Sequence, residues 1–79
     1  MDYYMQYVFE VIDRKNNEYR VAAKLYFHGE KLYSGIFSAK YIDGMVLLDL
    51  EFIKKEFEND SIRRNFIDKF KEFIKEQNS

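Results

Sequence analysis

The feature that most constrains this chain is the apolar face of its last stretch, residues 61–77. Large apolar side chains recur there at steps of four, one, three, three and one: Ile62, Phe66, Ile67, Phe70, Phe73 and Ile74. These steps fit the 3.6-residue period of an α-helix and exclude the two-residue period of a strand. A helix with several phenylalanines on one face needs a large apolar partner surface, and we expect the preceding residues to supply it.

Composition favours one small domain with an aromatic core. The chain has 79 residues, of which eight are Phe and seven are Tyr. At this length, folding buries only about 60% of the surface of the unfolded chain, so stability requires a rich core or assembly. The aromatic residues can supply such a core. We therefore predict a single domain that spans residues 1–79.

Two segments before the helix alternate between apolar and polar residues. In residues 3–12 the odd positions are apolar, and the same holds in residues 18–28. Alternation with a period of two is typical of strands that turn one side toward a core. We predict two antiparallel strands here, joined by a polar turn at residues 13–17, with their odd residues facing the helix.

The register of the third strand, residues 32–42, is harder to assign. Its odd row, with Tyr33, Phe37 and Tyr41, is the better candidate for the core. We predict a hairpin loop at residues 29–31, where Gly29 can adopt positive φ. A two-residue loop would turn the even row inward, so the odd row requires an odd-length loop or a bulge. Gly35 is the candidate bulge position.

The dipeptide Asp43-Gly44 predicts a type I′ turn, in which both central residues need positive φ. A short fourth strand follows at residues 45–48, with Ile42 opposite Met45. Asp49 then suits the N-cap of a first helix at residues 50–58. The expected core positions of this part of the chain are Tyr41, Val46, Leu48, Leu50, Ile53 and Phe57.

The whole pattern predicts an α+β two-layer sandwich. Four antiparallel strands at residues 3–12, 18–28, 32–42 and 45–48 precede helices at residues 50–58 and 61–77, in the order ββββαα. Asn59 to Ser61 separate the helices and offer two candidate N-caps for the second one. Because every connection is short, we expect the sheet order to be a simple 1-2-3-4 meander, with both helices on one face.

The side chains that most enzymes and metal sites require are scarce in this chain. It has no Cys and one His, which excludes thiol nucleophiles, disulfides and thiolate metal ligands. His28 lies at a strand end beside a turn, where a surface role is commonest, and the three glycines form no phosphate-binding loop. We expect no catalytic residue, no cofactor and no metal. An enzyme would need an active site shared between subunits.

The N-terminal sequence, MDYYMQYVFE, lacks the basic start and apolar run of a signal peptide. No apolar run approaches the roughly 18 residues that span a bilayer. We therefore expect a cytoplasmic protein that does not act at a membrane. If a phage encodes the chain, the compartment would be the cytoplasm of the host cell.

The outer face of the predicted sheet, turned away from the helices, has an unusual composition. A solvated face normally carries Lys, Glu, Thr or Ser at every second position. Here polar residues alternate with a large apolar set: Tyr4, Val8, Ile12, Ala22, Tyr26, Leu32, Ile36, Ile42, Met45 and Leu47. Such a mixture is more typical of an interface. The predicted partner-binding residues are Tyr4, Val8, Arg20, Lys24, Tyr26, Ile36 and Lys40.

Two alternatives to an interface stay open at this point. Scattered apolar residues are ordinary on the surfaces of soluble proteins. A different register of the third strand would also change which residues share the outer face.

The leading functional hypothesis is a small non-enzymatic protein-binding domain that acts through its sheet face or edge. Its partner would be another protein or a second copy of the chain. The size and the richness in Lys, Glu, Asn, Ile, Phe and Tyr also suit a phage-type inhibitor of a host or defence protein, as anti-CRISPR proteins are. This last step is an analogy of size and composition.

The alternative hypothesis is single-stranded nucleic-acid binding through the same face. Tyr4 and Tyr26 would stack on bases, and the cations Arg20, Lys24 and Lys40 would contact phosphates. The net charge of −1 counts against it, because binding to phosphates depends on excess positive charge.

Overall fold

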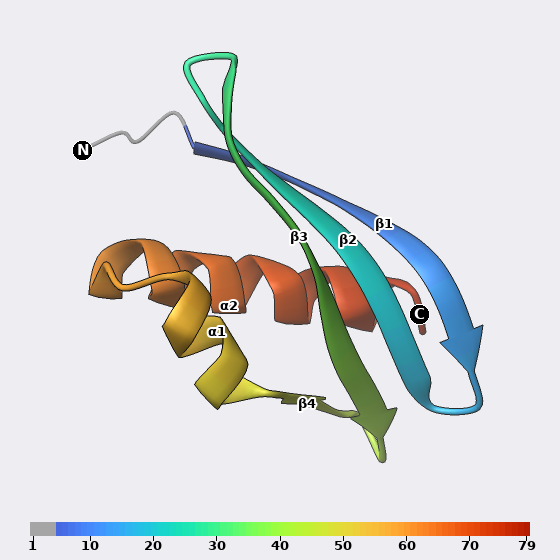
Figure 1. The fold of residues 1–79 in the computed structure, drawn as a ribbon. Coiled ribbons are helices and arrows are strands. Elements are labelled where there is room, and N and C mark those ends of the chain that lie inside the picture. Colours follow the sequence, from blue (N-terminus) through green and yellow to red (C-terminus); the bar gives the residue numbers. More distant parts are fainter. Residues whose placement is uncertain (1–4) are drawn as a thin grey trace.

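An antiparallel meander with both helices on one face makes up the part of the chain that the computed structural model describes, residues 5–79. The strands are β1 (Met5–Lys15), β2 (Glu18–Phe27), β3 (Glu30–Ile42) and β4 (Met45–Leu48), in the sheet order β1-β2-β3-β4. The helices are α1 (Leu50–Glu56) and α2 (Asp60–Glu76), and both lie on the same side of the sheet in Figure 1. The predicted two-layer α+β fold is confirmed, and residues 45–48 form a true strand.

The apolar face of α2 forms the centre of the core, as its period predicts. Phe66, Phe70 and Ile74 are fully buried. The ring of Phe66 lies 4.8 Å from that of Phe37 on β3 and 4.7 Å from that of Phe57 after α1, measured between centroids. The buried set also includes the odd row of β2 and part of β3: Tyr19, Val21, Ala23, Leu25, Phe37 and Ala39.

The first strand is longer than predicted because it contains a bulge. It continues to Lys15, and its pairing with β2 shifts between Val11 and Asp13. Ile12 is the extra residue, so the next inward position becomes Arg14, whose guanidinium lies 4.8 Å above the ring of Tyr19. No pattern in the sequence indicated a bulge here, because the residues that follow Ile12 are polar and predicted a turn.

The β2–β3 connection corrects the predicted loop. The turn is His28-Gly29, two residues with positive φ (52° and 83°), and not residues 29–31. Such a turn alone would put the even row of β3 inward. The pairing shift that prevents this lies between Leu25↔Tyr33 and Tyr26↔Lys31, which makes Leu32 the extra residue. The odd row of β3 faces the core, as predicted, but the bulge is not at Gly35.

Gly35 has a different role, which is to make room for an aromatic ring. A Cβ atom at this position would lie 2.9 Å from Cζ of Tyr33, so the tyrosine ring lies directly over the glycine. From there the Tyr33 hydroxyl donates a hydrogen bond to Oε1 of Glu56 at 2.5 Å. The absence of a side chain at Gly35 therefore lets Tyr33 connect β3 to the end of α1.

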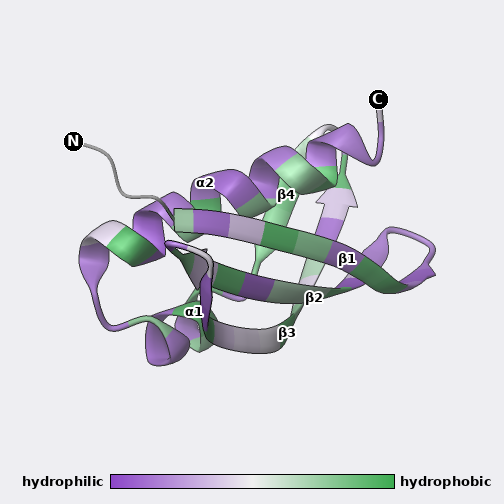
Figure 2. Cartoon of the chain, turned by 90° about the horizontal axis from the view of Figure 1, so that it is seen from above, coloured by the Kyte–Doolittle hydropathy of each residue, from purple (hydrophilic) through white to green (hydrophobic). Residues whose placement is uncertain are grey.

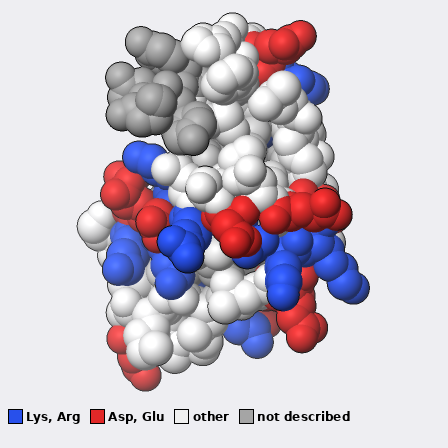
Figure 3. Space-filling view, turned by 90° about the vertical axis from the view of Figure 1, so that its left-hand side faces the viewer, with Lys and Arg blue, Asp and Glu red and all other residues white. Residues whose placement is uncertain are grey.

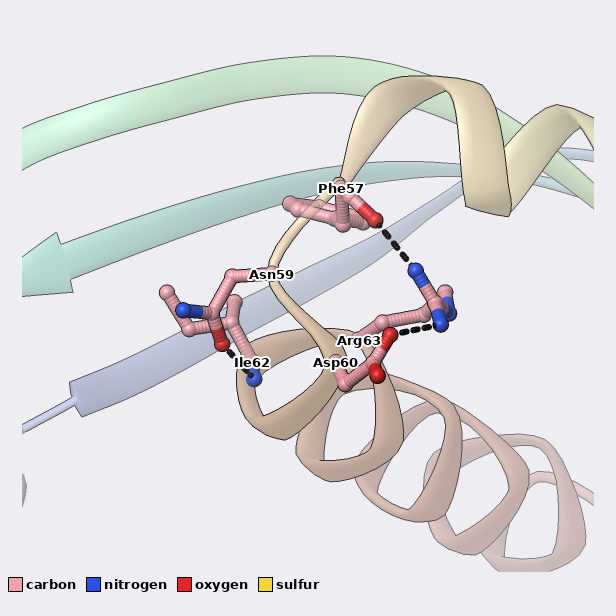
Figure 4. Close-up of polar contacts among 5 residues, drawn as sticks. All are labelled: Phe57, Asn59, Asp60, Ile62 and Arg63. Atoms are coloured by element: carbon pink, nitrogen blue, oxygen red, sulfur yellow. Dashed lines mark hydrogen bonds and ion pairs between the residues drawn. The ribbon is translucent and has the colours of Figure 1, made fainter.

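Both helices begin at a side-chain cap. Asp49 accepts a hydrogen bond from the backbone N–H of Phe52 at 3.1 Å, as predicted for the N-cap of α1. Asn59 is the N-cap of α2 and accepts from the N–H of Ile62 at 2.9 Å (Figure 4). Each cap satisfies a backbone donor that has no partner within its helix.

The turn between the helices shortens α1 relative to the prediction. The helix ends at Glu56 because Phe57 is extended (φ −127°), which turns its ring into the core. Arg63 holds this turn in place: it donates to the carbonyl oxygen of Phe57 at 2.9 Å and pairs with Asp60 (Figure 4). The α1–α2 angle is thus fixed by one buried ring and one arginine.

Leu50 is a wrong assignment to the core. Its side chain is 57% exposed, whereas Val46, Leu48 and Tyr41 pack against the core as expected. The prediction extended the alternation of β4 through Asp49. Because Asp49 is the N-cap, that alternation stops at Leu48, and the helix buries only Ile53 along its length.

We expect Phe66→Ala to lower the free energy of unfolding by about 3–5 kcal/mol, the cost of removing a fully buried aromatic side chain. That is a large part of the total stability of a small domain. Urea unfolding followed by far-UV circular dichroism would measure it. The matched control is Phe52→Ala, because Phe52 is 39% exposed although its ring contacts that of Phe37. Equal losses in the two variants would contradict the central position of Phe66.

Candidate protein-binding face

The face of the sheet opposite the helices, called the outer face below, carries the residues predicted to bind a partner. Strand pairing sets Val8 opposite Lys24, and Ala22 opposite Ile36. Val8 and Ile36 are each 49% exposed. The structure brings six of the seven predicted residues to this face: Val8, Arg20, Lys24, Tyr26, Ile36 and Lys40. Tyr4 lies outside the described residues.

The apolar patch on the outer face consists of Val8, Ala22, Tyr26 and Ile36. Tyr26 is the diagonal neighbour of Val8 across the β1–β2 pair, a spacing that an aromatic side chain can bridge. Lys24 lies between Val8 and Ser34 in the same row, and a lysine stem can cover apolar neighbours while its ammonium stays in water. The patch is therefore apolar at its base with one cation in its centre.

The end of the outer face that lies next to the β1–β2 turn is charged. Asp13 is paired with Arg20 across the strands, and Nζ of Lys40 lies 3.5 Å from Oε2 of Glu18. These residues border a hollow of about 280 Å³, lined by Asp13, Lys15, Glu18, Tyr19, Arg20, Ser38, Ala39 and Lys40. Acids thus accompany two of the three cations that were predicted to contact a partner, which lowers the positive potential of this end.

A second apolar group lies at the β3–β4 hairpin, apart from the predicted binding residues. It consists of Ile42, Met45 and Leu47, all exposed, with Ile42 paired to Met45 beside the Asp43-Gly44 turn. Ser38 and Lys40 separate it from the apolar patch along β3. The turn dipeptide already predicted that these side chains share the outer face, but the exposure of the neighbouring Leu50 had no signal in the sequence.

A groove of about 500 Å³ runs between the edge of β1 and helix α2, which lies beside β1 in Figure 2. Its lining is Met5, Gln6, Tyr7, Val8, Phe9, Lys69, Glu72, Phe73 and Glu76. The hydroxyl of Tyr7 is buried there and has no hydrogen-bond partner within residues 5–79, and burial raises the pKa of Tyr7. This groove was not predicted from the sequence.

The largest pKa shift among the described residues is that of Tyr33, on the helix side of the sheet. Burial, followed by the hydrogen bond to Glu56 and the negative charge of that carboxylate, raises the pKa of Tyr33 well above its usual value.

Among residues 5–79, no three His, Cys, Asp or Glu side chains form a group that could hold a metal ion. On the side shown in Figure 3, acidic and basic side chains are interspersed in a belt across the middle of the molecule.

No helix in the described part of the chain is both long and apolar enough to cross a membrane. Comparisons with models of known protein families, with curated protein sequences and with solved structures found no match.

We expect stability to fall with rising pH in a way that depends on Tyr33. Its raised pKa means that the folded state keeps the phenolic proton after the unfolded chain has begun to lose it. The contribution of Tyr33 is therefore fully present below about pH 10, the ordinary tyrosine pKa, and is lost as the pH rises toward the folded-state pKa. Urea unfolding of the wild type and Tyr33→Phe between pH 8 and 11 would measure this.

Tyr33→Phe should lose less stability over that range than the wild type, while Tyr26→Phe on the outer face serves as the control for substituting a tyrosine. If the wild type and Tyr33→Phe lose stability in parallel, the contact between Tyr33 and Glu56 does not favour the protonated hydroxyl.

Proposed function

We propose that this chain is a small non-enzymatic protein-binding domain and that the outer face is its binding surface. The observation that carries the proposal is the apolar patch, in which Val8 and Ile36 are half exposed on the one sheet face that the helices leave open. Burying such side chains against a partner removes apolar surface from water, at about 25 cal/mol per Å². Tyrosine and arginine, present here as Tyr26 and Arg20, are frequent anchors of interfaces.

The arrangement also indicates the chemistry of the partner. Lys24 has Val8 opposite it on β1 and Ser34 opposite it on β3, with Glu10 at a diagonal position. A matching surface would combine apolar side chains with a carboxylate or carbonyl oxygen that reaches this ammonium. The charged end with Arg20 and Lys40 would lie at the rim of the contact, where polar groups set orientation more than affinity. A partner of this kind is a folded protein surface.

Such a domain suits a phage-type inhibitor that acts on a host or defence protein in the cytoplasm, because an inhibitor by occlusion needs a binding surface and no catalytic residues. The support for this setting is the small size and the composition of the chain. The binding role itself does not depend on it.

The alternative, single-stranded nucleic acid on the same face, draws on Tyr26 beside Lys24 on β2. The pairing of Lys40 with Glu18 and the position of Asp13 opposite Arg20 weaken it, because both acids would repel phosphates. Titration of labelled single-stranded RNA and DNA at low salt separates the two ideas. An absence of binding up to about 100 µM, the weak limit of non-specific binding, would remove this alternative.

We expect the double substitution Tyr26→Glu and Ile36→Glu to abolish partner binding while the domain stays folded, because it puts two charges into the apolar patch. The immobilised chain would be exposed to a lysate of the organism that encodes it, or of that organism's host, and the retained proteins quantified. Lys71→Glu, on the exposed side of α2, is the control and should retain the same proteins as the wild type. Proteins retained equally by the folded double mutant would show that the outer face is not the binding surface.

A further inference from the structure

One edge of the sheet, formed by β1, has no neighbouring strand in the described structure. The direction in which the backbone N–H and C=O groups of β1 point can be derived from one hydrogen bond made by β3, on the far side of β2. The N–H of Tyr41 donates to the carbonyl oxygen of Asn17 at 2.9 Å, which shows that the odd residues of β3 direct their backbone groups toward β2. Their partners on β2, such as Val21 and Leu25, are also odd-numbered, and the backbone N–H and C=O groups of these partners point toward β3.

The backbone N–H and C=O groups of the even residues of β2 consequently point toward β1. These residues pair with the even residues of β1, as Lys24 does with Val8. In an antiparallel ladder, successive residues alternate in the direction of both backbone groups. The N–H and C=O groups of Tyr7, Phe9 and Val11 therefore point outward from the open edge. They are aligned to accept another strand.

Over residues 5–11, the open edge lacks the proline, the bulge and the inward-pointing charge that usually prevent such pairing. Proline, a bulge or an inward-pointing charge normally protects an exposed strand edge. Residues 5–11 contain no proline, the bulge comes only at Ile12, and the inward row is apolar. The free stretch of β3 is shorter, because the bulge at Leu32 limits it at one end and β4 pairs with it from Ala39 onward.

We propose that a second copy of this chain pairs its own β1 antiparallel with this edge, with Val8 on the two-fold axis, so that two four-stranded sheets become one. In this register Val8 meets the partner's Val8, and Tyr7 meets the partner's Phe9. Gln6 lies opposite the partner's Glu10, and Met5 opposite the partner's Val11. Every apolar residue thus faces an apolar one and every polar residue a polar one, on both faces of the joined sheet.

Neighbouring registers match less well. A two-fold axis at Phe9 would set Val8 opposite a glutamate and Gln6 opposite an isoleucine. An axis at Glu10 would set two carboxylates against each other, which destabilises a strand pair. Registers without a residue on the axis would pair the inward row with the outward row.

The groove beside the edge supports the same occupant. Its apolar wall is Phe73, whose ring lies 5.2 Å from that of Phe9, so an added strand can lay its inward side chains beside these rings. Along α2 the groove is lined by Lys69 at one end, by Glu76 at the other and by Glu72 between them. Because a two-fold axis reverses the direction of the helix, the basic end of each copy comes to the side of the partner's acidic end.

The test uses the absence of cysteine in the natural chain, so that Val8→Cys contains a single thiol. Opposed residues without mutual hydrogen bonds have Cα atoms about 4.5 Å apart, within the range of a disulfide. We expect Val8→Cys to form a disulfide-linked dimer on mild oxidation, seen on non-reducing gels and reversed by reductant.

Gln6→Cys is the matched control, because an offset of four residues along the strand and the spacing between strands place the two Gln6 Cα atoms about 14 Å apart in this register, too far for a disulfide. The double substitution Gln6→Cys and Glu10→Cys should restore the cross-link. Circular dichroism would verify that each variant is folded. A folded Val8→Cys that stays monomeric, or a Gln6→Cys that cross-links equally fast, would overturn the proposal.

This proposal concerns the edge and stands apart from the binding role of the outer face. Adding Tyr26→Glu and Ile36→Glu to Val8→Cys should leave the cross-link intact, since neither residue lies on β1. If the folded variant with Tyr26→Glu and Ile36→Glu still retains the same proteins as the wild type and the cross-link forms, the edge proposal survives without the proposed function. If Val8→Cys stays monomeric while Tyr26→Glu with Ile36→Glu abolishes partner binding, the proposed function survives without the edge proposal.

Discussion

The packing of α2 against the sheet is the interaction on which the rest of the structure depends. Phe66 is the point where rings from three other segments meet: Phe9 of β1, Phe37 of β3 and Phe57 at the end of α1. Without this helix, the strands would form a four-stranded meander with apolar residues on both faces. The helix determines which of the two faces becomes the core, and it leaves the other face to solvent or to a partner.

The two bulges follow from that choice. The side chains of the odd rows of β2 and β3 pack against α2, whereas the two-residue turn at His28-Gly29 alone would turn the even row of β3 inward. The extra residue Leu32 shifts the register so that the odd row faces the core. On β1 the extra residue Ile12 brings Arg14 over Tyr19, whose hydroxyl donates to Asn78 beyond α2. The bulges therefore adjust the strand ends to the helix without changing the alternation that creates the apolar patch.

The elements of the fold were predictable from the sequence because each depends on a local period or a local turn residue. The period of α2, the alternation of β1 and β2, and Asp43-Gly44 each indicated the correct element. The need for a bulge or an odd-length loop at β3 was predicted, but the position of the bulge at Leu32 was not. The exposure of Leu50 and the groove beside β1 were not predictable either, since they depend on where the helix lies relative to the sheet. Gly35 illustrates the difference: its conformational freedom suggested a bulge, whereas tertiary packing of the Tyr33 ring explains it.

The two open surfaces of the sheet, the outer face and the β1 edge, meet at Val8. A strand that pairs along the edge extends the sheet sideways and leaves its outer face uncovered. Self-association through β1 would therefore place two apolar patches next to each other across the axis, joined through the Val8 side chains of both copies. A joined face of this kind would bind a two-fold symmetric or elongated partner with two patches at once. The gain from such bivalent contact comes from effective concentration and needs no further contact residues. In a chain of 79 residues, pairing at an edge is thus a means of enlarging a binding surface without enlarging the core.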